Sequence, residues 1–171
     1  GWIDRLTAPH DTPERLDLMF EDCHLEVRSN SRRLLEQLAY YFKDFLVRGE
    51  PWHDIRITAI EAPAPEFPME FTVKQPDPGK TKIKEEWVDF DDGRIVRKRI
   101  TGMHFLFGRG QHLAVGPCVD NYNQVINFIN NRFIEWQLNR GCLLGHAAAV
   151  THAGRGISLA GFSGMGKSTL A

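Results

Sequence analysis

Residues 156–168, GISLAGFSGMGKS, contain the strongest signal in the chain. Residues 161–168 match the pattern G-x-x-x-x-G-K-[ST], which is typical of a phosphate-binding loop. Glycines let such a loop turn tightly, so that several backbone N–H groups converge on one phosphate without a Cβ in the way. Lys167 would reach the β- and γ-phosphates as a point charge, and the Ser168 hydroxyl would bind Mg²⁺.

The sequence on both sides of the loop favours this interpretation. Residues 156–160 predict a short apolar strand that enters the loop, and residues 167–171 predict the first turn of a helix. The positive end of that helix dipole would face the phosphate. The alternative is an ordinary glycine-rich turn, which the flanking strand and helix disfavour.

A hairpin is predicted over residues 142–160, upstream of the loop. One apolar stretch contains His146, the glycines at 154–156 predict the turn, and a second strand leads to Gly161. Residues 146–153 and 157–161 would then be antiparallel neighbours. Ordinary phosphate-loop NTPases instead have parallel strands, whose crossover needs a dozen or more residues.

This arrangement resembles the bacterial HPr kinase/phosphorylase family, relatives of the phosphoenolpyruvate carboxykinases. In that family a histidine on the preceding strand stands at the spacing of His146, fifteen positions before Gly161, and the loop also ends in GKS. The sequences AVGPC (114–118), NQVINFINN (123–131) and GFSGMGKSTLA (161–171) are still more similar to the HPr kinase-related kinase B proteins. The resemblance is firm from about residue 113 and loose before residue 100.

The resemblance implies a kinase that binds ATP and Mg²⁺ and transfers the γ-phosphate to a hydroxyl group of a protein or small-molecule acceptor. A serine hydroxyl is the expected acceptor group. It implies catalytic roles for Lys167 and for His146, which would orient or shuttle protons near the transferred phosphate. It also implies a homo-oligomer. The implied nucleotide-binding residues are Gly161, Ser163, Gly164, Met165, Gly166, Lys167, Ser168 and Thr169, with Ser168 also the metal ligand.

Phosphoryl transfer also needs an acidic metal ligand and a base or positioning group. The resemblance implies that these carboxylates lie downstream of the loop, whereas the given sequence extends four residues beyond Lys167. We therefore expect a truncated kinase core that does not catalyse alone. Two alternatives stay open: a nucleotide-binding interaction module without transfer activity, and a phosphate-loop NTPase that only hydrolyses.

Composition places the chain among ordinary globular proteins. Of 171 residues, 42% are hydrophobic and 25% are charged. A net charge of −1 argues against a nucleic-acid partner, since a basic excess normally supplies that affinity. No apolar run approaches the roughly 18 residues of a membrane helix, and residues 1–11 lack the pattern of a secretion signal. We expect a cytoplasmic protein without a membrane partner, whose three separated cysteines are reduced and buried.

The predicted fold class is α+β or α/β. A β-rich N-terminal region, residues 1–118 with a helix at 30–48, is expected first. The resemblance implies that residues 119–171 are the incomplete start of an HPr kinase/PEP carboxykinase-like phosphate-loop core, with a helix at 121–140, the hairpin at 142–160 and the loop at 161–168. Apolar periodicity and turn residues predict the following elements: strands within 16–28, a helix at 30–48, a strand at 54–61, a proline-rich loop at 62–80, a hairpin at 82–100, strands at 103–107 and 111–116, and a helix at 121–140.

Two features of this region allow alternative interpretations. The basic run RIVRKRI (94–100) would either bind phosphate or pair with acids across a hairpin turning at Asp92-Gly93; that turn places Glu86 opposite Arg99 and favours pairing. The helix at 121–140 is rich in asparagine, a mediocre helix former. Its amides would either meet polar partners within the fold, which we favour, or line a site.

Overall fold

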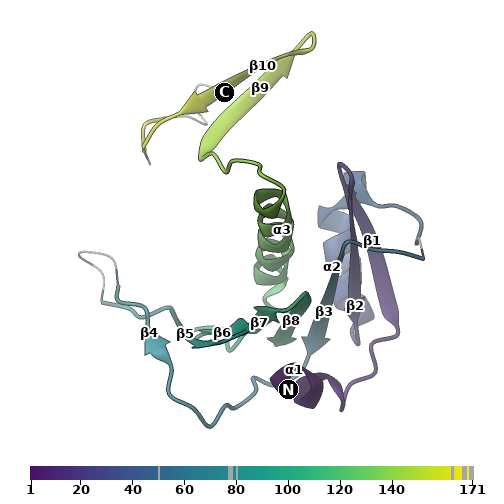
Figure 1. Cartoon of the computed structure of the whole chain (residues 1–171), viewed down its shortest axis with the longest axis vertical. Coiled ribbons are helices and arrows are strands. Elements are labelled where there is room, and N and C mark those ends of the chain that lie inside the picture. Colours follow the sequence, from purple (N-terminus) through teal and green to yellow (C-terminus); the bar gives the residue numbers. More distant parts are fainter. Residues whose placement is uncertain (50, 77–78, 80, 163, 167–168, 170–171) are drawn as a thin grey trace. The chain divides into compact units, whose positions relative to one another are not determined.

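The computed structural model describes residues 1–49, 51–76, 79, 81–162, 164–166 and 169. These residues form two compact units, 1–133 and 134–171 (Figure 1). Along the chain the elements are α1 (Trp2–Thr7), β1 (Glu14–Phe20), β2 (Cys23–Ser29), α2 (Arg32–Tyr41), the short 3-10 helix η1 (Lys43–Phe45), β3 (Ile55–Glu61), β4 (Thr72–Val73), β5 (Glu85–Phe90), β6 (Gly93–Lys98), β7 (His104–Gly108), β8 (Gln111–Gly116), α3 (Tyr122–Asn139), β9 (Ala147–His152) and β10 (Arg155–Ala160).

The first unit is built on a mixed sheet of eight strands in the order β1-β2-β3-β8-β7-β6-β5-β4. The pairs β2–β3 and β3–β8 are parallel, and the other neighbours are antiparallel. Helix α2 lies in the connection between the parallel strands β2 and β3, as such a connection requires. The predicted mixture of helices with a β-rich region is therefore confirmed at this level.

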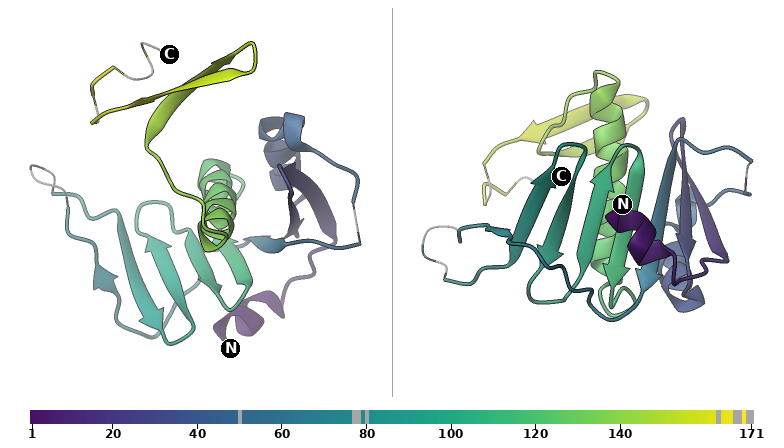
Figure 2. Two further views of the ribbon diagram at one scale, coloured as in Figure 1. Left: turned by 45° about the horizontal axis from the view of Figure 1, so that its top comes forward. Right: turned by 60° about the horizontal axis from the view of Figure 1, so that its bottom comes forward.

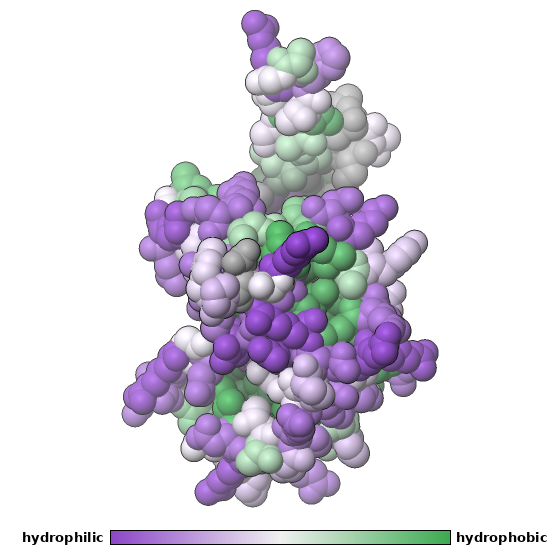
Figure 3. Space-filling view, turned by 90° about the vertical axis from the view of Figure 1, so that its right-hand side faces the viewer, coloured by the Kyte–Doolittle hydropathy of each residue, from purple (hydrophilic) through white to green (hydrophobic). Residues whose placement is uncertain are grey.

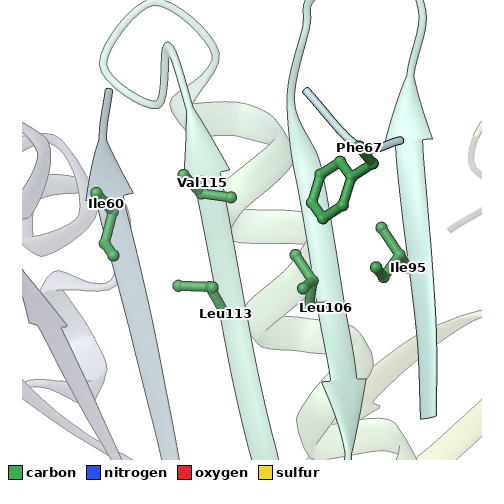
Figure 4. Close-up of a cluster of buried hydrophobic side chains, with 6 residues drawn as sticks. All are labelled: Ile60, Phe67, Ile95, Leu106, Leu113 and Val115. Carbon is green, nitrogen blue, oxygen red and sulfur yellow. The ribbon is translucent and has the colours of Figure 1, made fainter. Parts of the chain in front are cut away.

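One face of the sheet carries a cluster of apolar side chains. Ile60, Leu113, Val115, Leu106 and Ile95 come from four neighbouring strands, and Phe67 of the proline-rich loop packs on them (Figure 4). Partly buried side chains of α1 pack against the same cluster: Trp2, Ile3 and Leu6. The loop is thus irregular, as predicted, yet it supplies core residues to the sheet.

Helices α2 and α3 cover the opposite face, so that α1 and α3 lie on different sides of the sheet (Figure 2, right). Each helix turns a buried stripe toward it, and these stripes contain Leu34, Leu35 and Leu38 of α2 and Val125, Ile126 and Ile129 of α3. The Ser31 side chain accepts a hydrogen bond from the Leu34 N–H and caps α2.

Helix α2 is shorter than the helix predicted at 30–48. It ends at Tyr41, because the following residues turn back to pack beside β1. The ring centroids of Phe42 and Phe45 lie 5.4 and 5.1 Å from that of Phe20, and Leu46 forms a bridge with Leu18. These tertiary contacts outweigh the helical spacing of the same side chains. The second helix, α3, agrees with its prediction.

The hairpin of β5 and β6 turns one position earlier than predicted. Phe90 pairs with Gly93, so the turn residues are Asp91 and Asp92, and Glu86 lies opposite Arg97 rather than Arg99. Gly93 serves close packing instead of a positive φ: a Cβ there would lie 2.6 Å from the Phe107 carbonyl oxygen. The register moves by two residues, so every side chain keeps its predicted face.

The charges of this hairpin pair across the strands, as the favoured interpretation predicts. Arg97 binds Glu86, Lys98 binds Glu85, and Arg94 binds Asp89. Cys23 and Cys118 are buried, whereas Cys142 is exposed, so the prediction of buried thiols is wrong for Cys142; all three are free. Within the described ranges, no helix is both long and apolar enough to cross a membrane.

The side of the first unit that carries α2 and β1 is mixed in hydropathy. Figure 3 faces this side and shows apolar regions bordered by strongly hydrophilic ones. Large side chains that follow α2 in the chain are exposed, including Phe45, Leu46 and Trp52. Isolated exposure of this kind is common in soluble domains and does not by itself identify a site.

Candidate functional site

The second unit contains the predicted hairpin. Strands β9 and β10 pair antiparallel from Ala147–Ala160 to His152–Arg155. The turn residues are Ala153 and Gly154, with φ of 49° and 74°, rather than the predicted 154–156. Two consecutive positive φ angles are those of a type I′ turn, whose twist matches the strands it joins. The antiparallel pairing itself is confirmed.

This register places His146 and Gly161, which are distant along the chain, at the same end of the hairpin. Ala147 pairs with Ala160, so His146, which precedes β9, and Gly161, which follows β10, lie at the same end of the hairpin. His146 is exposed. The fourteen residues between His146 and Gly161 therefore form one strand, one two-residue turn and the return strand.

The glycine-rich loop follows β10 directly. Gly164 and Gly166 adopt φ of 82° and 73°, a region that L side chains rarely enter. A Cβ at either position would have nothing within 4 Å among the described atoms. The Met165 N–H donates to the Phe162 carbonyl (3.3 Å), and the Thr169 N–H donates to the Gly166 carbonyl (3.0 Å). The described part of the loop therefore turns at Gly164 and Gly166 and leaves open space around both.

Open glycines at positive φ fit the close approach of a phosphate group to the backbone. Of the predicted nucleotide-binding residues, the structure describes Gly161, Gly164, Met165, Gly166 and Thr169. The other three, Ser163, Lys167 and Ser168, lie outside the described residues, so the predicted metal ligand and the catalytic lysine are not placed. Among the residues described, no group of three His, Cys, Asp or Glu side chains is arranged to hold a metal ion.

The first unit contains a set of buried charged residues that the sequence analysis did not single out. Asp17, His24 and Glu26 are at most 7% exposed, although alternation in β1 and β2 would assign them to a solvent-facing side. The Asp17 Oδ1 lies 2.9 Å from His24 Nε2 and 2.7 Å from Arg15. The sequence could have indicated this set, because ionisable residues occupy positions 17, 24 and 26, which share one face of the β1–β2 hairpin.

Arginine side chains compensate these buried carboxylates. Glu26 lies within 3.2 Å of Arg15, Arg28 and Arg56. Burial alone would raise the pKa of Glu26, but hydrogen bonds from Arg28 and Arg56 lower it below its usual value. Burial opposes ionisation of Asp17 in the same way, and its hydrogen bonds with Arg15 and His24 lower its pKa. Both groups are therefore anions at neutral pH, and the set is best described as a structural ion network.

Comparison with known proteins does not assign the chain to a family. No family model matches it, and neither does any of the curated proteins or solved structures with which it was compared. The likeness of residues 113–171 to the HPr kinase family therefore depends on the sequence motifs alone.

Proposed function

We propose that the protein is a phosphate-loop kinase of the HPr kinase-like type, which transfers the γ-phosphate of ATP to a hydroxyl group. The observation that carries the proposal is the antiparallel hairpin that places His146 and Gly161 at one end, directly before the glycine-rich loop. Open glycines at 164 and 166 give further support, because phosphate must approach the backbone there.

Each residue of the motif has a distinct role in this proposal. Backbone N–H groups between Gly161 and Thr169 cradle the phosphates, and the Lys167 ammonium neutralises the β- and γ-phosphate charge. His146 lies beside the start of the loop, where it orients the acceptor hydroxyl or accepts its proton. When Mg²⁺ is bound through the Ser168 hydroxyl, it neutralises charge on the transferring group. The acceptor is a serine hydroxyl of a protein or a hydroxyl of a small molecule.

The proposal is tested on the full-length protein with radiolabelled ATP. Three readings are followed together: nucleotide binding, release of inorganic phosphate, and transfer to an acceptor, with a small HPr-type phosphocarrier protein as the first one tried. Transfer supports the kinase. Phosphate release without transfer would establish the NTPase alternative, and binding without either reaction would establish the interaction module.

Two substitutions, each with a matched control, test the roles of Lys167 and His146. Lys167→Ala is expected to abolish nearly all turnover, whereas Lys43→Ala, an exposed lysine of the first unit, leaves it unchanged. His146→Ala is expected to lower transfer at least about tenfold. The matched control is His152→Ala, since His152 lies at the turn end of the same hairpin. Equal activity of the His146 and His152 variants would remove His146 from the mechanism.

A further inference from the structure

A pocket of about 590 Å³ lies within the first unit, on the sheet face that α3 partly covers. Its walls are strands β5 to β7, the segments that follow β4 and lead into β5, residues 100–101, and one side of α3. A volume of this size is in the range of small-molecule sites. All of its lining residues lie between positions 74 and 132, within the first unit.

Positive charge is concentrated in this pocket. Among the residues that the structure describes, four lysines line it (Lys74, Lys82, Lys84 and Lys98) together with Arg132, against one carboxylate, Glu85. The chain as a whole has a net charge of −1, so the excess is local. Two of the lysines, Lys74 and Lys98, form ion pairs with Glu85. Among the residues that the structure describes, Lys82 and Lys84 have no ion-pair partner.

The side of α3 that faces the pocket carries three amide side chains beside Phe128 and Arg132. Gln124, Asn127 and Asn131 recur at spacings of three and four, which places their amides in one stripe along the helix. Each amide offers both a donor and an acceptor, so the stripe can bind oxygen groups of a ligand. At Asn127 and Asn131 the asparagine-rich helix thus lines a pocket. This agrees with the less favoured alternative, that the amides line a site.

The floor of the pocket is aromatic. Phe105, Phe107 and Phe128 line it, and the Phe105 and Phe128 ring centroids lie 4.9 Å apart. The Arg132 guanidinium lies over the Phe107 ring at 4.2 Å, which holds a cation directly beside the apolar floor. A ligand for this pocket therefore needs an apolar or planar body as well as negative charge.

We propose that this pocket binds a small organic polyanion, a planar or apolar body that carries two or more phosphate or carboxylate groups. The body lies on the phenylalanine floor. The anionic groups reach Lys82 and Lys84, whose ammonium groups no protein carboxylate neutralises in the described structure. The amides of α3 bind the remaining oxygen atoms. This proposal does not depend on the kinase function.

The test uses pyranine, a fluorescent pyrene that carries three sulfonates and so combines a planar body with several anionic groups. Binding to the full chain is followed by fluorescence anisotropy at low salt, where charges are screened least. The wild-type protein is expected to bind. Lys82→Gln/Lys84→Gln is expected to weaken binding about tenfold or more, since it removes two unpaired charges from the wall.

The matched control removes the same charge elsewhere in the unit. Lys43→Gln/Arg48→Gln changes two exposed cations outside the pocket and is expected to leave the dissociation constant within about twofold. On α3, Asn131→Asp introduces a carboxylate into the pocket and weakens binding, whereas Asn123→Asp introduces it outside and does not. All four positions are exposed, so the fold is retained.

Several results would overturn the proposal. These are no binding by the wild-type protein, equal loss in the two double variants, or loss only in Lys167→Ala, which would place the probe at the phosphate loop. Competition with inorganic tripolyphosphate separates the ligand sources. If tripolyphosphate displaces pyranine less effectively than pyrenetetrasulfonate does, the pocket prefers an organic anion. If the two compete equally, the aromatic floor does not contribute to binding.

Discussion

The Nε2 atom of His24 lies 2.9 Å from the Asp17 carboxylate, and both side chains are buried on one face of the β1–β2 hairpin. This pair belongs to an ion network in which Glu26 is surrounded by three arginines. The acidic members of the network, Asp17 and Glu26, are at most 7% exposed. Removal of the network should therefore affect stability much more than the loss of an exposed ion pair.

Glu26→Gln tests this network. The substitution removes the buried carboxylate that three partly exposed guanidinium groups contact, while Arg15 keeps Asp17. We expect a loss of about 2 kcal/mol in the free energy of unfolding. The matched control is Glu36→Gln, because Glu36 pairs with Arg32 on the exposed side of α2. That variant should lose less than about 0.5 kcal/mol. Urea unfolding measures both, and similar values for the two would contradict the structural role.

Stability is expected to fall as the pH decreases from about 6.5 to 4, in part because of His112. Burial, together with the charge of Arg132, lowers the pKa of His112 to about 4. The unfolded chain takes up this proton near pH 6.5, so between the two values it binds more protons than the native state does. Burial also lowers the pKa of His104, which acts in the same direction.

The measurement is urea unfolding of the wild-type protein and of His112→Gln between pH 7 and 4. The variant should show a shallower fall in the free energy of unfolding over this range. An unchanged slope would mean that His112 titrates normally in the native state. The depressed pKa values of Asp17 and Glu26 act at lower pH, because the stability they contribute is lost only below the ordinary carboxyl range.

Gly108→Ala should be strongly destabilising, by about 3 kcal/mol or more. A Cβ at Gly108 would lie 2.0 Å from the Asp92 carbonyl oxygen, where the β5–β6 turn packs against β7. Gly110→Ala is the control, since Gly110 has φ of 72° but nothing within 4 Å of a Cβ. It should lose only the cost of the backbone conformation, about 1 kcal/mol. If thermal or urea unfolding gave equal losses, the close approach at Gly108 would be wrong.

Ser31→Ala should destabilise the first unit by about 1 kcal/mol, because it removes the side-chain acceptor of the Leu34 N–H at the start of α2. Ser31→Asp keeps an acceptor there and adds a favourable charge at the helix N-terminus, so its stability should equal or exceed that of the wild type. Chemical denaturation of the two variants checks this. A loss in the aspartate variant as large as in the alanine variant would argue against the cap.

Most strands and both long helices could be predicted because their alternation and periodicity are local. The end of α2 could not be predicted, because Phe42 and Phe45 fit the helical pattern while their partner, Phe20, lies in strand β1. The turn at residues 91–92 was misplaced because Gly93 suggested a backbone conformation, whereas its function is to leave room for Phe107. Contacts between distant residues caused both errors.

The candidate sites differ in the same way. The hairpin and loop between His146 and Thr169 are continuous in sequence, so their order and the left-handed glycines could be anticipated. The lysine pocket could not, because Lys74 and Lys82 approach Asn131 only after α3 has packed on the sheet. No pattern within one segment contains that information.

The parallel pairing of β3 with β8 also determines the order in which the large sheet can assemble. Thr58 and Leu113 are partners in this ladder, although the proline-rich loop and four strands separate them in the chain. The β1–β2 hairpin and the β5–β8 meander each close over short loops, so each can form early as a nearly independent nucleus. The pairing of β3 with β8 closes the longest loop of any pairing in the sheet, so we expect it to form last.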